Sequence, residues 1–233
     1  MITQKFIDQA KQLNISLTNT MLNQFEHYYK KLVSYNEKVN LTAITEKEGV
    51  YIKHFLDSII IAPCLKQNAT LIDVGTGAGF PSLPLKIVRP DLVVTMVDSL
   101  NKRIVFLDEL IKELNLINIV AVHARAEDYI KTHRECYDVI VARAVASLNT
   151  LSEYCIPFIK VKGLFYAYKS INIEDELLQA NKAINVLGGE LLEVKEVVLP
   201  DTNISRSVVI IKKRLNTPKQ FPRDKNQPKT SPL

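Results

Sequence analysis

The hydrophobic residues of this chain change their spacing near residue 70. From there onward, continuous apolar runs of strand length alternate with segments of helical periodicity. The apolar runs cover residues 70–74, 92–97, 117–122, 137–142, 163–168, 191–198 and 207–213. The helical segments cover residues 82–89, 102–115, 147–160 and 173–187. Continuous apolar strands separated by helices indicate an α/β fold with a doubly wound, mainly parallel sheet that is covered on both faces.

The last two strand-like runs are connected differently from the others. Only the short loop Pro200–Arg206 separates them, and parallel strands need a crossover of a dozen or more residues. We therefore predict an antiparallel hairpin at this point. The expected result is a seven-stranded sheet with a reversed last strand.

The first 62 residues have the periodicity of helices. Three groups of apolar residues recur at helical intervals: Ile2, Phe6, Ala10 and Leu13; Leu22, Phe25, Tyr29, Leu32 and Val39; and Ile52, Phe55, Leu56, Ile59 and Ile60. We expect an N-terminal helical cap at 1–62, a ligand-binding domain at 63–214 and a C-terminal arm at 215–233. Four polar residues of the cap are either helix-end hydrogen-bond partners or part of a substrate-facing surface: Asn40, Thr42, His54 and Asp57.

The stretch from Thr70 to Pro81 has the clearest ligand-binding pattern. A short apolar run is followed by Gly75, Gly77 and Gly79 and then by a helical segment. A strand, a glycine-rich turn and a helix in this order form the ligand crevice at the carboxyl edge of an α/β sheet. Glycine suits this position because the backbone can then approach a ligand closely.

Two features distinguish this turn from a dinucleotide site. The dinucleotide fingerprint has a third glycine where this chain has Phe80. In addition, Asp73 precedes the first glycine by two residues, and we expect it at the mouth of the crevice. A carboxylate there would repel a pyrophosphate but attract a cation, such as the ammonium and sulfonium groups of S-adenosylmethionine.

A second carboxylate is spaced as expected for binding a ribose. Asp98 ends the next apolar run, 23 residues after Gly75. An acid at about this distance holds the ribose diol in doubly wound folds. Without a ligand, the same pattern would be an ordinary glycine-rich turn between a strand and a helix, and that alternative stays open.

Length and composition exclude several classes of protein. The 233 residues are 47% hydrophobic and 24% charged, which is typical of a globular chain with a full core. No apolar run reaches the roughly 18–20 residues of a membrane span, and the N-terminus lacks a signal-peptide pattern. Cys64, Cys136 and Cys155 fit neither a disulfide framework nor a zinc site. We therefore expect a cytoplasmic protein without a membrane anchor or a metal.

The C-terminal residues differ from the rest in charge. Lys212 to Leu233 contain seven Lys or Arg residues and one acid, which leaves 23 basic and 24 acidic residues in 1–211. Four prolines prevent a regular helix or inner strand here. We expect an extended basic arm that binds a polyanion, or else a solvated tail that only increases solubility.

Several catalytic motifs are missing from the sequence. It has no Gly-x-Ser-x-Gly elbow, no phosphate-binding P-loop and no His-x-x-x-His pair on a helix. Residues 141–146 lack the Asn/Asp-Pro-Pro-Tyr pattern that is used on exocyclic amines. Arg143 stands at this strand end instead, either facing a ligand or paired with a helix carboxylate on the surface.

Several segments of the chain together resemble a known family. They are Asn40-Leu-Thr42, His54-x-x-Asp57-Ser58, Asp73-Val-Gly-Thr-Gly-Ala-Gly-Phe-Pro81, Asp98-Ser-Leu-x-Lys102-Arg103, Arg143-Ala-x-Ala-Ser-Leu148, Tyr168-Lys169 and Phe221-Pro-Arg-x-x-x-x-Pro-x-x-x-Pro-Leu233. From about residue 25 to the end, the chain is similar to the small-subunit ribosomal RNA methyltransferase G family, also called glucose-inhibited division protein B. Phe80 departs from the leucine that relatives often carry.

This resemblance implies a Rossmann-like class I methyltransferase. Such an enzyme would transfer a methyl group from S-adenosylmethionine to ring nitrogen 7 of a guanine in the 530 loop of 16S ribosomal RNA. The partner would be 16S ribosomal RNA or the small ribosomal subunit, with neither DNA nor a membrane involved. The resemblance gives five cofactor contacts, and the residues themselves add two: Gly75, Phe80, Ala126, Glu127 and Arg143, with Gly77 and Asp98.

No catalytic residue is assigned at this point. Nitrogen 7 of guanine already carries an in-plane lone pair, so the transfer needs neither a general base nor a covalent nucleophile. Two other functions stay open on the same fold. One is a nicotinamide-dependent oxidoreductase, and the other is a ribosome-binding factor that holds the cofactor without turnover.

Overall fold

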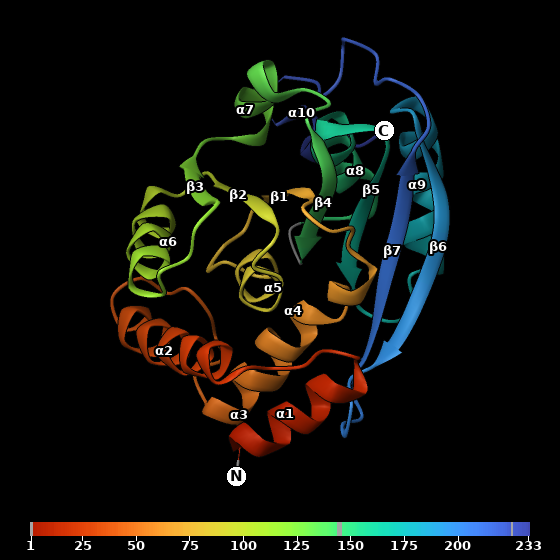
Figure 1. Cartoon of the computed structure of the whole chain (residues 1–233). Helices are drawn as coiled ribbons and strands as arrows, with labels where there is room; N and C mark the ends of the chain where they lie inside the picture. Colours follow the sequence, from red (N-terminus) through yellow and green to blue (C-terminus); the bar gives the residue numbers. More distant parts are fainter. Residues whose placement is uncertain (1, 144–145, 225) are drawn as a thin grey trace.

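The structure is a computed structural model that describes residues 2–143, 146–224 and 226–233 (Figure 1). Parts of two sequence motifs lie outside the described residues. They are Ala144 and Val145, which follow Arg143, and Lys225 of the basic tail.

One sheet contains the seven strands of the described part of the chain. These are β1 (Thr70–Val74), β2 (Val93–Asp98), β3 (Ile119–His123), β4 (Tyr137–Arg143), β5 (Ile159–Lys169), β6 (Gly189–Val198) and β7 (Ser205–Lys213). Their order is β3-β2-β1-β4-β5-β7-β6. Strands β1 to β5 pair in parallel, whereas β7 is antiparallel to both β5 and β6. The predicted seven-stranded sheet with a reversed last strand is confirmed.

Helices cover both faces of this sheet (Figure 1). They are α5 (Ser82–Val88), α6 (Asn101–Glu113), α7 (Ala126–His133), α8 (Leu148–Cys155), α9 (Glu174–Val186) and the short α10 (Gln227–Thr230). Residues of α5 and α6 join the core on one face, and residues of α7, α8 and α9 join the core on the other. The sequence pattern did not predict α7. Ile130 is its one buried residue, so the helix lacks the repeated apolar positions that indicate a helix.

One predicted boundary is wrong. The helical pattern at 147–160 ends at Cys155, and β5 already begins at Ile159. Between them, Ile156–Phe158 form a single 3₁₀ turn that contains Pro157. Proline has no N–H to continue the helical hydrogen bonds, so the helix stops there.

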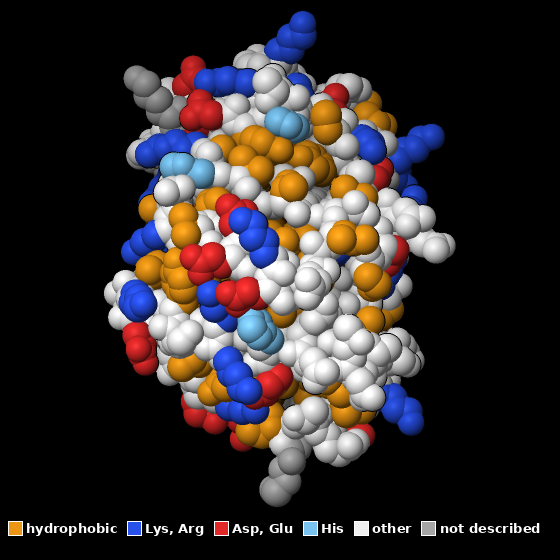
Figure 2. Space-filling view, turned by 60° about the vertical axis from the view of Figure 1, so that its left-hand side comes forward, with side chains coloured by type: hydrophobic (Ala, Val, Ile, Leu, Met, Phe, Trp, Pro, Cys, Tyr) orange, Lys and Arg blue, Asp and Glu red, His pale blue; other side chains and the backbone are white. Residues whose placement is uncertain are grey.

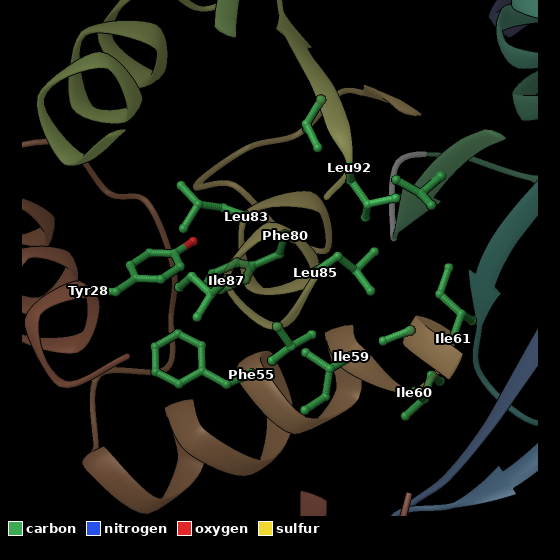
Figure 3. Close-up of a cluster of buried hydrophobic side chains, with 14 of the residues drawn as sticks. Tyr28, Phe55, Ile59, Ile60, Ile61, Phe80, Leu83, Leu85, Ile87 and Leu92 are labelled. Carbon is green, nitrogen blue, oxygen red and sulfur yellow. The ribbon is translucent and has the colours of Figure 1, made fainter. Parts of the chain in front are cut away.

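The N-terminal helices pack on one face of the sheet. They are α1 (Ile2–Gln12), α2 (Asn19–Asn36), α3 (Lys47–Val50), a π-helical turn (Tyr51–Leu56), α4 (Asp57–Ile59) and a 3₁₀ turn (Ala62–Cys64). Figure 3 shows Tyr28 and Phe55 from these helices lying next to Phe80 and the side chains of α5. Each fully buried side chain of this size contributes roughly 1.5–3 kcal/mol. The cap and the sheet therefore share one continuous core.

Charged side chains are mixed on the face of the molecule that carries α2 and α6. Figure 2 shows Lys and Arg interspersed with Asp and Glu over this side, and hydrophobic side chains that gather in the upper part of the view. Lys31, for example, pairs with Glu109 and Glu113 at 2.8 and 2.7 Å. Among the described residues, no helix is long and apolar enough to cross a lipid bilayer.

The C-terminal segment packs against the body, so the expectation of an extended arm is wrong. Phe221 is 6% exposed and joins the core that contains α8 and α9. Arg223 forms an ion pair with the fully buried Glu153 at 2.7 Å, and Arg214 pairs with Glu190. Lys213 is also buried and donates to the carbonyl of Ile156. Three of the seven basic residues are thus held by the body, and this reduces the charge available to a polyanion.

The Arg223–Glu153 pair gives a stability prediction. Replacing Arg223 by Ala leaves the Glu153 carboxylate buried without its counter-ion, and such a change costs about 3 kcal/mol. We expect urea unfolding to show a loss of that size. Lys219→Ala, an exposed change in the same segment, should alter stability by less than about 0.5 kcal/mol. Equal stability of the two variants would contradict the docking of the tail.

Candidate active site

A crevice of about 580 Å³ opens at the carboxyl ends of β1, β2 and β4. The strand order reverses at this point, because the connection from β1 leads to β2 on one side and the connection from β3 leads to β4 on the other side of β1. Ligands bind at such switch points in open α/β sheets, and the volume is within the range of small-molecule sites. All seven residues predicted from the sequence line the crevice: Gly75, Gly77, Phe80, Asp98, Ala126, Glu127 and Arg143.

The glycine turn fixes the floor of the crevice. Gly75 N–H donates to the carbonyl of Val97 at 2.8 Å, which ties the turn to the end of β2. Gly77 has a φ of +62°, and a Cβ added there would meet no atom within 4 Å. The missing side chain therefore leaves the open crevice unobstructed, and a branched residue would both crowd it and strain the turn.

Asp73 is not at the mouth of the crevice, and that expectation is wrong. The side chain is fully buried beneath the turn. Its Oδ2 accepts hydrogen bonds from the hydroxyls of Thr76 at 2.8 Å and Ser82 at 2.6 Å. Burial raises the pKa of Asp73 to about 7, although these hydrogen bonds oppose the shift. Asp73 therefore connects the turn to the start of α5 and does not line the crevice.

Asp98 connects the glycine turn to the strand next to it. Its Oδ2 accepts from Gly77 N at 2.9 Å and from Arg103 Nη1 at 3.0 Å, and its Oδ1 accepts from Leu100 N at 2.9 Å. A carboxylate has about four acceptor positions. One position on Oδ1 is therefore left for a hydroxyl group in the crevice.

Arg143 lies between the crevice and a buried carboxylate. Its Nη1 donates to Asp57 Oδ2 at 3.1 Å, and the other Asp57 oxygen accepts from Arg206 Nε at 3.0 Å. Burial raises the pKa of Asp57, although the two guanidinium groups favour its charged form. The guanidinium of Arg143 also lies 4.9 Å from the centre of the Phe80 ring. Arg143 therefore lines the crevice, and the helix carboxylate that it pairs with is buried and not on the surface.

His54 is held neutral in the wall of the crevice. Its Nδ1 lies 3.2 Å from Arg143 Nη2, and its Nε2 lies 2.8 Å from Thr42 Oγ1. Arginine can only donate, so Nδ1 is the acceptor and Nε2 carries the proton. Burial, together with the charge of Arg143, lowers the pKa of His54 to about 4. The imidazole ring stacks on Phe80 with centroids 4.5 Å apart.

Two of the four polar residues of the cap belong to the crevice, and the other two do not. Thr42 and His54 line the crevice. Asp57 is buried behind Arg143, and Asn40 is exposed outside the crevice. The π-helical turn Tyr51–Leu56 carries His54, and such turns are often found at functional sites.

Four crevice residues were missed by sequence reasoning: Ala124, Arg125, Tyr154 and Asn226. Arg125 immediately precedes the predicted Ala126. Asn226 belongs to the C-terminal motif, which was interpreted as an arm. The three cysteines do not line the crevice, and the described residues contain no cluster of three or more His, Cys, Asp or Glu that could hold a metal ion.

The residues present fit an adenosyl cofactor. The glycine turn leaves open space, Asp98 has a free acceptor position, and Ala126 and Glu127 begin α7 at the far side of the crevice. The doubly wound sheet with a reversed last strand and a crevice at this edge is the architecture of the Rossmann-like class I methyltransferase fold. Solved structures support the fold. TYW2 from M. jannaschii, in complex with AdoMet, has a TM-score of 0.55 at 17% identity, with 68% of this chain and 75% of that chain covered. Precorrin-6y C5,15-methyltransferase from Geobacter metallireducens has a TM-score of 0.52 at 16% identity, with 73% and 90% covered.

Sequence comparison identifies the family. Residues 21–205 match the GidB family, described as rRNA small subunit methyltransferase G. The ribosomal RNA small subunit methyltransferase G of Bacillus subtilis (strain 168) is 49% identical over 99% of this chain and 98% of the relative. The protein of the same name from Lactobacillus helveticus (strain DPC 4571) is 48% identical over the same shares. The chain belongs to the rRNA small subunit methyltransferase G family. The resemblance seen in the motifs is confirmed, and neither the nicotinamide-dependent oxidoreductase nor the non-catalytic factor is supported.

Asp98 gives the first site prediction. Asp98→Ala removes a charged acceptor from the crevice and frees Gly77 N, so the affinity for S-adenosylhomocysteine should fall. A charged hydrogen bond corresponds to about 10- to 150-fold in affinity. Titration calorimetry measures this directly, with Asp108→Ala, an exposed carboxylate on α6, as the matched control. An unchanged dissociation constant would contradict the role of Asp98.

His54 gives a prediction about pH. Its folded-state pKa of about 4 lies below the ordinary value of 6.5, so the unfolded chain binds more protons between these values. His54 therefore contributes stability that is present above pH 6.5 and is lost as the pH falls towards 4. This component should be missing in His54→Gln. The free energy of unfolding, measured with urea between pH 7 and 4.5, should therefore change less with pH in this variant than in the wild type. Parallel curves would mean that His54 is not held neutral.

Proposed function

We propose that this protein transfers a methyl group from S-adenosylmethionine to ring nitrogen 7 of a guanine in the 530 loop of 16S ribosomal RNA. The family supports methylation of small-subunit ribosomal RNA. The choice of nitrogen 7 comes from the resemblance in the motifs, and one observation agrees with it: both nitrogens of His54, which lines the crevice, are already hydrogen-bonded. As ribosomes assemble in the bacterial cytoplasm, we place the protein there.

Each part of the crevice suits a different part of the cofactor. When bound, S-adenosylmethionine supplies an electrophilic methyl group. Asp98 would hold one ribose hydroxyl at its remaining acceptor position, and Ala126 and Glu127 would border the adenine. Arg143 uses three of its five N–H groups on described residues, namely Asp57, Lys53 and His54. Two N–H groups remain to bind a carboxylate in the geometry that guanidinium groups prefer.

Neither His54 nor Arg143, which both line the crevice, is able to remove a proton from a substrate. His54 is neutral and donates to Thr42 through Nε2, so it has no free lone pair. Arg143 stays protonated and cannot act as a base. Guanine nitrogen 7 needs no deprotonation, and alignment of its lone pair with the methyl group, within about 3–3.5 Å, supplies most of the rate enhancement. Methylation of an exocyclic amine would require a group that accepts a proton.

The RNA is expected to contact the rim of the crevice. Arg125 is exposed on this rim and Lys102 is exposed at the start of α6, whereas Arg103 is already paired with Asp98. The tail offers less free charge than its composition implies, because Lys213, Arg214 and Arg223 are already paired or buried. Each phosphate contact with single-stranded RNA contributes about −0.7 to the salt slope. Attraction to RNA would therefore depend on the rim and not mainly on the tail.

The proposed function is tested by mapping the product. Small ribosomal subunits that lack the modification are incubated with the protein and labelled S-adenosylmethionine. Chain cleavage specific for 7-methylguanine, followed by reverse transcription, then locates the methylated base. We expect a single stop in the 530 loop, and none with Gly77→Val.

Because no cysteine lines the crevice, a folded triple Cys→Ala protein should keep its rate within about five-fold, as no covalent step is involved.

Two outcomes would contradict this function. One is a labelled guanine that is methylated on its exocyclic amine, or a label outside the 530 loop. The other is the absence of labelling on both subunits and naked 16S RNA by a folded protein that binds S-adenosylhomocysteine.

A further inference from the structure

The C-terminal segment is anchored to the same helix that forms one wall of the crevice. Glu153 of α8 accepts from the backbone N–H of Arg223 at 2.8 Å and from its guanidinium at 2.9 and 2.7 Å. One turn earlier, Thr150 Oγ1 donates to the carbonyl of Pro228 at 2.9 Å. Tyr154, the neighbour of Glu153, lines the crevice. Helix α8 therefore places the C-terminal segment next to the cofactor site.

A second anchor holds the beginning of the segment. The guanidinium of Arg134, just after α7, donates to the carbonyls of Phe221 at 2.7 Å and of Thr217 and Pro218 at 2.8 Å each. Phe221 and Thr217 are both buried. The segment is thus held at two places, by Arg134 just after α7 and by α8. These two helices border the crevice opposite the glycine turn.

Asn226 lies between Arg223 and Pro228, the two residues that are bound to α8, and it reaches the crevice. Its carbonyl accepts from the backbone N–H groups of Lys229 at 3.0 Å and Thr230 at 2.9 Å, which fixes the backbone at this residue. Asn226 lines the crevice together with Ala126, Glu127 and Tyr154. In the proposed function this is the end of the crevice that receives the adenine.

We propose that Asn226 is a cofactor-binding residue whose side-chain amide recognises the adenine ring. Adenine presents the N6 amino donor beside the N7 acceptor along one edge. An asparagine amide presents an acceptor oxygen beside donor hydrogens and matches this edge with two hydrogen bonds. The C-terminal segment then forms the outer wall of the adenine site. This inference rests on the proposed function, because it requires an adenosyl cofactor in the crevice.

The experiment compares two ligands on three proteins. Titration calorimetry is carried out with S-adenosylhomocysteine and with S-inosylhomocysteine, in which a carbonyl oxygen replaces the N6 amine. The proteins are the wild type, Asn226→Ala and the matched control Gln227→Ala, which removes an exposed neighbouring amide outside the crevice. Thermal unfolding first shows that all three are folded.

We expect Asn226→Ala to lower the affinity for S-adenosylhomocysteine by about 2- to 12-fold, which is the contribution of a neutral hydrogen bond. Gln227→Ala should bind it like the wild type. The wild type should bind S-adenosylhomocysteine more tightly than S-inosylhomocysteine. In the inosine ligand both N7 and the oxygen that replaces N6 are acceptors, so one of them must face the acceptor oxygen of the Asn226 amide. This preference should shrink in Asn226→Ala.

The possible results separate the inference from the proposed function. An unchanged affinity in Asn226→Ala, or an equal loss for both ligands, would overturn the role of Asn226 in reading the adenine while leaving methyl transfer intact. Failure of the folded wild type to bind S-adenosylhomocysteine would overturn both proposals.

Discussion

The glycine turn after β1 is held by two carboxylates, and the rest of the crevice depends on its position. Asp73 binds Thr76 and Ser82 from below, and Asp98 binds Gly77 N from the neighbouring strand. The parallel register of β1 and β2 pairs Val74 with Val97, so both strands end at the same level. The turn is consequently pre-organised, and a ligand does not have to order it. Pre-organisation of this kind reduces the entropic cost of binding.

Phe80 links this turn to the N-terminal helices. Its ring stacks on Tyr28 with centroids 5.4 Å apart and on His54 at 4.5 Å, and the Arg143 guanidinium lies close to it. The helical cap is therefore part of the crevice wall and supplies His54 and its partner Thr42. Asp57 of the cap in turn orients Arg143 at the end of β4. A displacement of the cap would be expected to disturb the cofactor site as well as the core.

The sequence predicted the features that depend on local patterns, but not those that depend on distant partners. Continuous apolar runs were sufficient for the sheet, and the seven predicted site residues do meet in one crevice. The position of Asp73 was wrong because a strand pattern does not show that its carboxylate turns under the loop to reach Ser82. The tail was misinterpreted because composition counts charges without their partners. Glu153, 70 residues away, holds Arg223, and no local pattern reveals this pairing.

The central claim is that the glycine turn and Asp98 form a site for an adenosyl cofactor and not for a dinucleotide. Titration calorimetry of the wild-type protein, first with S-adenosylhomocysteine and then with NAD, tests this most directly. We predict that one molecule of S-adenosylhomocysteine binds per chain, and that NAD neither binds nor displaces it. Saturable binding of NAD at the same site, with an affinity equal to or above that of S-adenosylhomocysteine, would contradict the claim.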